Sequence, residues 1–194
     1  MLPPAGPPWT FRVSLDGKPI GQHRFSSMAA ENSGQRNVRI EANFEVRWLG
    51  LAVYHYQHVA IERWRGNCLV GLSAETDDNG QRTRVRAALT GDSLQVTEPA
   101  TESAPGCVMS FAYWHPAMRA QHRLLNAQTG RIETVRITPL GEKTLNMGEA
   151  AIDVTGWRIG GLPQPIDVWY SRDGDWVGLD TFVDGGRALS YRRL

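Results

Sequence analysis

One run of the sequence places histidine, glutamate and aromatic residues at alternate positions. Within residues 51–64 these are Tyr54, Tyr56, His58, Glu62 and Trp64. Alternate side chains of a strand point to the same face, so the five share one face of a predicted strand. Polar groups set between aromatic rings on an inward face suit a pocket for an amphipathic ligand. The alternative is a solvent-facing surface with ordinary cross-strand aromatic pairs.

Three further residues are candidates for acid–base chemistry. Tyr113 and His115 precede Pro116 at a predicted helix start, where a histidine can act near a cleft mouth or simply cap the helix. Asp167 lies among strand formers: facing inward it would be a buried carboxylate with a raised pKa, and facing outward it would belong to an ordinary alternation. The catalytic candidates are His58, Glu62, His115, Asp167 and Tyr113, and the ligand-binding candidates are Tyr54, Tyr56, His58, Trp64, Tyr113 and Trp114.

Several common chemistries lack their motifs. There is no nucleophile elbow, P-loop or H-E-x-x-H sequence. The histidines have no tight spacing, and His55 and His58 project to opposite faces of the predicted strand, so we expect no metal site and no cofactor. Residues 77–80 lack the downstream ligands of a calcium loop and indicate a hairpin turn. His58 and Glu62 lie about 13 Å apart along a strand, so they cannot bond each other directly.

The two cysteines, Cys68 and Cys107, favour a disulfide. Each follows a polar loop segment and opens an apolar run, and neither belongs to a C-x-x-C or zinc-finger pattern. Closing such a loop of about 40 residues would stabilise the fold by roughly 4 kcal/mol, and a disulfide implies an oxidising compartment. The alternative is two buried free thiols in a cytosolic protein.

The composition says more about the possible binding partners than about the activity. The chain has 194 residues and a net charge of +1, which gives no reason to expect nucleic acid or an anionic membrane as a partner. No apolar stretch approaches the roughly 20 residues of a membrane span. We expect a flexible Pro-rich start over residues 1–8 and a single β-rich domain over 9–194, and the oligomeric state stays open. The start lacks a signal peptide, so we expect a mature exported protein with Met1 added, or else a cytosolic protein with a Pro-rich start.

The dominant period is two, which predicts strands. Polar and apolar residues alternate almost perfectly from Val38 to Trp48, and Leu49-Gly50 is a plausible bend before the next strand. Frequent Asn-Gly and Asp-Gly pairs predict tight hairpins. About ten to twelve short-linked strands predict a mainly all-β fold, either a curved antiparallel sheet or an open β-barrel. Pro116 followed by good helix formers predicts one main helix near 116–125, which would cover the barrel mouth.

Distinctive stretches carry a family resemblance. They are Leu49-Gly50-Leu51 with Tyr54, Tyr56 and His58; Glu62 with Trp64; and residues 66–69, 76–80, 105–114, 124–130, 166–170 and 189–192. Together they resemble an uncharacterised family of exported bacterial proteins, catalogued as a domain of unknown function. The resemblance implies a periplasmic β-rich protein and brings no established activity. Its C-terminal half resembles, more distantly, open-barrel lipoprotein and lipid carriers, which implies an apolar concavity.

Three functions are therefore open. The first is a periplasmic binding or carrier protein for a lipid-like or other hydrophobic small molecule, favoured by a large sheet and seven tryptophans. The second is an enzyme of unfamiliar class with an acid–base site at the barrel mouth. The third is a structural envelope protein that pairs through a strand edge.

Overall fold

The computed structural model describes residues 8–29, 34–48, 51–148 and 150–194, and strands dominate them. The strands are β1 (Trp9–Leu15), β2 (Lys18–Ala29), β3 (Gln35–Trp48), β4 (Leu51–Arg65), β5 (Cys68–Asp78), β6 (Gln81–Thr90), β7 (Ser93–Glu98), β8 (Glu102–Pro105), β9 (Met109–Ser110), β10 (Arg123–Leu125), β11 (Ile132–Thr134), β12 (Arg136–Asn146), β13 (Ala151–Gly160), β14 (Ile166–Ser171), β15 (Trp176–Val183) and β16 (Arg187–Arg193). Two short 3-10 helices, η1 (Pro116–Ala120) and η2 (Asp184–Gly186), complete the described elements.

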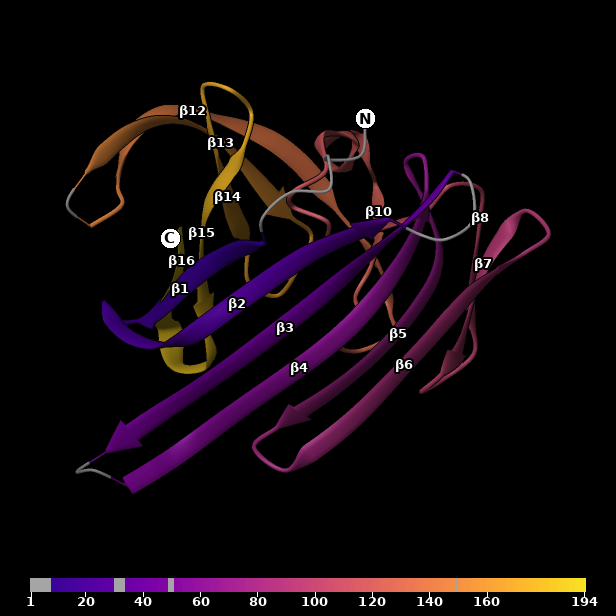
Figure 1. The fold of residues 1–194 in the computed structure, drawn as a ribbon, viewed down its shortest axis with the longest axis horizontal. Helices are drawn as coiled ribbons and strands as arrows, with labels where there is room; N and C mark the ends of the chain where they lie inside the picture. The colour runs from indigo at the N-terminus through magenta and orange to yellow at the C-terminus, as the bar shows by residue number, and fades with distance from the viewer. Residues whose placement is uncertain (1–7, 30–33, 49–50, 149) are drawn as a thin grey trace.

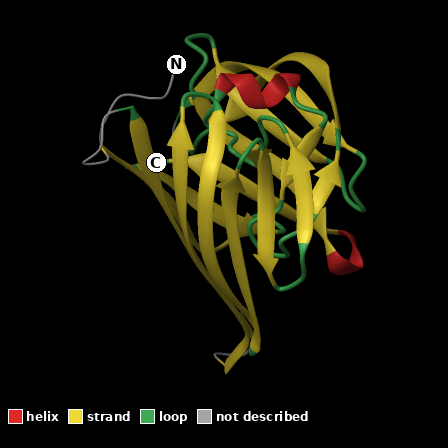
Figure 2. Ribbon diagram, turned by 90° about the vertical axis from the view of Figure 1, so that its right-hand side faces the viewer, coloured by secondary structure: helices red, strands yellow, loops and turns green. Residues whose placement is uncertain are grey.

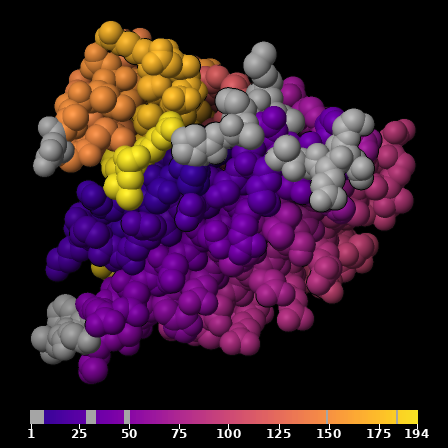
Figure 3. Space-filling view, in the orientation of Figure 1, coloured from indigo at the N-terminus to yellow at the C-terminus, as the bar shows by residue number. Residues whose placement is uncertain are grey.

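Thirteen strands form one antiparallel sheet that curves without closing. Its order is β12-β13-β14-β15-β16-β1-β2-β3-β4-β5-β6-β7-β8, so β12 and β8 are the two edges (Figures 1 and 2). The pairing of β1 with β16 joins the two ends of the described chain inside the sheet. In the space-filling view the N-terminal strands lie side by side as a continuous surface (Figure 3). The predicted curved antiparallel sheet is thus confirmed as a large open one.

A second, three-stranded sheet of β9, β10 and β11 packs against the large sheet. Met109, Leu124 and Leu125 of this small sheet are fully buried, and they share one core with Trp64 and Leu72 of the large sheet. We call residues 108–135, which contain this small sheet, the inner segment. The main core therefore lies between the inner segment and the inward face of the large sheet.

The alternation seen in the sequence decides which face of β4 is inward. From Tyr56 to Trp64, every even-numbered side chain is buried and every odd-numbered one is exposed. The predicted tight turns at Asp16-Gly17 and Asn79-Gly80 are also confirmed, because all four residues adopt the positive φ angles that such hairpins require. The expected bend at Leu49-Gly50 and residues 1–7 of the Pro-rich start lie outside the described residues.

The predicted main helix near 116–125 is wrong. Only Pro116–Ala120 is helical, as a 3-10 turn, and residues 123–125 form β10 instead. Leu124 and Leu125 pair with β9 on one side and β11 on the other, which buries both side chains completely. Helix propensity is a weak preference that such burial overrides. Among the described residues, no helix is long and apolar enough to cross a membrane.

The predicted disulfide is present and joins the inner segment to the large sheet. Cys68 begins β5, and Cys107 immediately precedes the inner segment, 39 positions further along the sequence. One residue further on, the Leu69 amide donates a hydrogen bond of 3.0 Å to the Val108 carbonyl. The covalent bond and the hydrogen bond hold the start of the inner segment against the sheet.

We expect reduction of this disulfide to destabilise the fold by about 4 kcal/mol, because the freed loop regains its chain entropy on unfolding. The measurement is urea denaturation of the oxidised protein and of the Cys68→Ser/Cys107→Ser double variant. The same curves for the native protein with a reductant provide the control. Equal midpoints for all three would show that the bond does not stabilise the fold.

Candidate ligand-binding site

Two adjoining cavities lie between the inward face of the large sheet and the inner segment. The inner cavity has a volume of about 490 Å³, and the outer cavity has a volume of about 650 Å³. His23, Gln128, Leu189 and Tyr191 line both cavities, so the two are neighbours. Their walls come from the first five strands, the inner segment, the loop at residues 162–164 and the C-terminal strands.

The outer cavity is mostly apolar and aromatic. Its apolar and aromatic lining residues are Leu15, Ile20, Phe44, Val46, Val53, Tyr54, Tyr56, Phe182, Val183, Leu189 and Tyr191. Tyr56 of β4 stacks on Phe44 of β3 with ring centres 5.2 Å apart and nearly parallel planes. Val53 and Phe182 are 53% and 51% exposed, so they lie where this cavity meets solvent.

The inner cavity carries the buried polar groups. His23 comes from β2, His58 and Glu62 from β4, and Ser110 from β9, and all four line it. His58 lies opposite Thr76 of β5, and its Nδ1 shares a hydrogen bond of 2.9 Å with Thr76 Oγ1. Burial lowers the pKa of His58 to about 4, so its ring is uncharged at neutral pH.

Glu62 is an acidic group in apolar surroundings. Its cross-strand neighbours are Val38 and Leu72, and the residue is 1% exposed. Burial raises the pKa of Glu62 to about 7, although the hydrogen bond from Trp64 lowers it in part. The Trp64 Nε1–H donates to Glu62 Oε2 at 3.0 Å, whereas the Ser110 hydroxyl lies near without a bond of ordinary geometry. A carboxyl that titrates near neutrality can give or take a proton.

His23 also lines the inner cavity, and it comes from β2, a strand that the sequence analysis did not select. Its ring packs on Phe25 with centres 4.4 Å apart and contacts Phe44 and Tyr191. Neither ring nitrogen has a hydrogen-bond partner among the described residues. Burial, with a smaller effect of the nearby His58, lowers the pKa of His23 to about 3.

The predicted ligand-binding residues Trp64 and Trp114 lie side by side, but neither of them lines the two cavities. Trp64 contacts Trp114 edge-on, with ring centres 5.3 Å apart, and stacks on His115. These three side chains are buried in the core behind the inner cavity. His115 caps η1, because its Nδ1 accepts a hydrogen bond from the Ala117 amide. Tyr113 does line the inner cavity, and its carbonyl accepts a bond from the Tyr170 hydroxyl.

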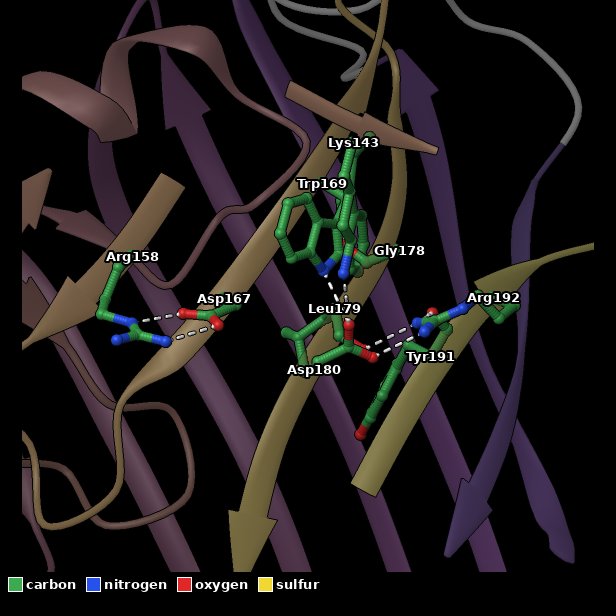
Figure 4. A network of polar contacts seen from close by, with 10 residues as sticks. Lys143, Arg158, Asp167, Trp169, Gly178, Leu179, Asp180, Tyr191 and Arg192 are labelled. Carbon is green, nitrogen blue, oxygen red and sulfur yellow. Dashed lines mark hydrogen bonds and ion pairs between the residues drawn. The ribbon is translucent and has the colours of Figure 1, made fainter. Parts of the chain in front are cut away.

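Asp167 does not belong to this site. Val168 and Tyr170 of β14 point into the core, so the alternation directs Asp167 to the opposite face. There it receives two hydrogen bonds from Arg158, of 2.7 and 2.8 Å (Figure 4). Nearby, Asp180 accepts a bond from the Trp169 indole and pairs with Arg192. In this network the carboxylate of Asp167 is paired with Arg158 and that of Asp180 with Arg192.

The described residues offer no group of three or more metal-ligating side chains. Asp77 instead closes the β5–β6 hairpin, where it accepts hydrogen bonds from the Gly80 amide and from Arg82. The site combines largely apolar and aromatic walls with the polar side chains of His23, His58, Glu62 and Ser110. Charged residues also line it, namely Asp78, Arg131, Glu133 and Arg187.

A family model described as a domain of unknown function, DUF6134, matches residues 11–194. The chain belongs to this family. That membership confirms the resemblance to an uncharacterised β-rich family, and no curated protein sequence matches the chain. Among solved structures, it is similar to a β-barrel-like protein of domain of unknown function DUF1849 from Brucella abortus. The TM-score is 0.64 at 12% identity, over 96% of this chain and 94% of that one, a likeness that shows the shared fold alone.

Sequence reasoning missed part of this DUF6134 site. It did not select His23, Phe44, Ser110, Gln128 or Tyr191 as site residues. The alternation of Gly21, His23 and Phe25 was an available signal, because it places the histidine beside an inward aromatic ring. Nothing in the sequence places Ser110 beside Glu62, since the two belong to different sheets.

Glu62 should make stability fall as pH rises. The unfolded chain releases this proton near the ordinary value of 4.5, whereas the folded protein keeps it until about 7. The folded state thus binds more protons between these values, so the stability that Glu62 contributes decreases across that window. Relative to the native protein, Glu62→Gln should gain about 3 kcal/mol of unfolding free energy from pH 4.5 to 7.

The measurement is urea denaturation at several pH values, followed by Trp fluorescence. Taking the difference between variant and native protein removes the opposite pH dependence of His23 and His58. Glu75→Gln, on the exposed face of β5, is the matched control and should give a flat difference. A flat difference for Glu62→Gln as well would contradict the raised pKa.

Trp64→Ala should destabilise the fold by about 3–5 kcal/mol, because it empties a fully buried site. Trp64→Phe, which keeps an aromatic ring but loses the N–H to Glu62, should cost less. The neighbouring exposed residue gives the control, since Arg65→Ala should change stability by less than about 0.5 kcal/mol. Thermal or urea denaturation decides; a Trp64→Ala cost near that of Arg65→Ala would rule out its place in the core.

Proposed function

We propose that this chain is a non-catalytic binding or carrier protein for a lipid-like or other hydrophobic small molecule. The observation that carries the proposal is the pair of adjoining cavities with largely apolar and aromatic walls. Small-molecule pockets typically measure about 300–1,000 Å³ and combine such walls with a few polar groups. Each cavity falls within that range, and together they suit an elongated ligand.

The proposed location is the periplasm or another exported site. Its support is the Cys68–Cys107 disulfide, because disulfides persist in oxidising compartments. A structural envelope protein is less well supported, because such a protein needs an exposed edge but no space inside the sheet.

An enzyme is the second candidate, favoured by one observation. Glu62 combines a pKa near 7 with a position on the inner cavity wall, which is the pattern of a general acid or base. A partner nucleophile has not been identified beside it: Ser110 lies near, but its hydroxyl has no base bonded to it among the described residues. The binding function therefore explains more of the cavity than catalysis does.

The test uses the hydrocarbon probe diphenylhexatriene, whose fluorescence rises in apolar surroundings. We expect saturable binding to the native protein. Leu189→Trp adds bulk to a side chain that lines both cavities and should weaken binding by about tenfold or more, or abolish it. Overpacking of this kind costs about 1–3 kcal/mol of stability at most sites, so folding is checked by circular dichroism.

Ile61→Trp provides the matched control, because Ile61 points outward from β4 and is 38% exposed. It should leave probe binding unchanged. Native mass spectrometry of protein purified from its own host then looks for a retained ligand. Probe binding that Leu189→Trp and Ile61→Trp affect equally, or no saturable binding at all, would count against the proposed function.

A further inference from the structure

The hairpin of β3 and β4 extends beyond the strands beside it, as the lower part of Figure 2 shows. The pairing of β3 with β2 stops at Phe44, and the pairing of β4 with β5 stops at Tyr56. Among the described residues, 45–48 and 51–54 therefore form ladder pairs only with each other. We call residues 45–48 and 51–54 the hairpin end. A two-stranded hairpin gains little stability by itself, so this extension contributes little to holding the fold together.

The hairpin end exposes large apolar side chains near the opening of the outer cavity. Leu51 is 72% exposed and Val53 is 53% exposed, and Phe182 of β15 is 51% exposed. Val53 and Phe182 both line the outer cavity, and Leu51 lies two residues before Val53 on the same strand. Among the described large apolar residues, only the C-terminal Leu194 is also more than half exposed. A group of exposed apolar side chains of this kind marks an interaction surface.

This exposed surface continues into the wall of the outer cavity. Val46, Val53 and Tyr54 of the hairpin end line that cavity, and Phe182 lines it from β15. We propose that the hairpin end docks on the surface of a lipid bilayer, so that a hydrophobic ligand passes between the bilayer and the outer cavity. This inference rests on the proposed binding function and adds the surface from which the ligand comes. Because apolar molecules are unfavourable in water, a cavity that opens onto a bilayer spares its ligand that exposure.

The charges near the hairpin end favour a neutral lipid surface over an anionic one. Arg47 pairs with Glu45, and Arg187, which lines the outer cavity, pairs with Asp16. Asp78, an exposed carboxylate, lines the same cavity. Anionic lipids attract clusters of unpaired basic side chains, whereas both of these arginines already have a carboxylate partner. Docking therefore depends on the burial of apolar side chains, which salt screens little.

A second copy of the chain suits this surface less well than a bilayer does. It would cover Val53 and Phe182, and with them the opening of the outer cavity that a carrier needs for exchange of its ligand. A stable protein–protein interface also takes about 20–30 residues on each side, far more than the apolar side chains that gather here. Burial of a few apolar side chains is sufficient for reversible attachment to a bilayer surface.

The first measurement is flotation of the native protein with phosphatidylcholine vesicles, which carry no net charge. We expect association that changes by less than about twofold between low and high salt. Leu51→Asn should weaken it by about tenfold, because a polar side chain replaces an apolar one at the bilayer surface. Leu51 is not among the residues that line either cavity. The variant should therefore keep the urea midpoint and the diphenylhexatriene affinity of the native protein.

Leu194→Asn is the matched control, because it makes the same substitution at another exposed leucine. Leu194 is 60% exposed, and its amide donates a hydrogen bond to the Thr10 carbonyl, away from the hairpin end (Figure 1). This variant should associate with vesicles as the native protein does. No association with neutral vesicles, or equal effects of Leu51→Asn and Leu194→Asn, would overturn the inference. Association confined to anionic vesicles at low salt would overturn it as well.

The second measurement follows the transfer of diphenylhexatriene from the loaded protein to phosphatidylcholine vesicles that carry a quenching lipid. Transfer by contact has a rate that rises with vesicle concentration, whereas release into water has a rate independent of it. We expect a rising rate for the native protein and for Leu194→Asn, and about tenfold slower transfer for Leu51→Asn. A rate independent of vesicle concentration would overturn the inference and leave the proposed function standing. Failure of the native protein to bind the probe would instead overturn the proposed function, and ligand transfer at the bilayer with it.

Discussion

The packing of the inner segment into one end of the curved sheet is the interaction on which the rest depends. The Cys68–Cys107 bond holds the start of the segment, and Trp64 of β4 packs against Trp114 within it. The 28 residues of this segment do not fill all the space on the inward face of the sheet, where cavities of about 490 and 650 Å³ lie beside it. The segment therefore completes a core at one end and leaves the cavities beside it. The core and the cavities therefore have one cause, which is that the inner segment covers only part of the inward face of the sheet.

How far the sequence predicts this structure depends on the range of the interactions involved. The inward face of β4 follows from local alternation, so Tyr56, His58 and Glu62 could be placed on one face in advance. The segment around Leu124 could not, because its pairing with β9 and β11 competes with helix formation through residues distant in sequence. His23 was overlooked for the same reason, since only the neighbouring strands show that its ring shares a cavity with His58.

Burial shifts the pKa values of the two buried titratable side chains of β4, His58 and Glu62, in opposite directions. Burial lowers the pKa of His58 to about 4 and raises that of Glu62 to about 7. Between these values both groups are uncharged, because the low-polarity surroundings disfavour the ionised form of each. Above this range Glu62 becomes an anion beside Trp64, whose indole N–H can still stabilise it. The same desolvation that lowers stability thus keeps both side chains uncharged between about pH 4 and 7.

The cavities also depend on the two ends of the described chain meeting. His23 and Tyr56 come from early strands, whereas Leu189 and Tyr191 come from the last strand. They face one another because β1 pairs with β16, and Asp16 binds Arg187 across 171 positions of sequence. Contacts of such long range form only at a large cost in chain entropy, so the cavity is complete only when the last strand has docked. A protein built in this way cannot complete these cavities from a partly folded sheet, which ties the proposed binding to completion of the fold.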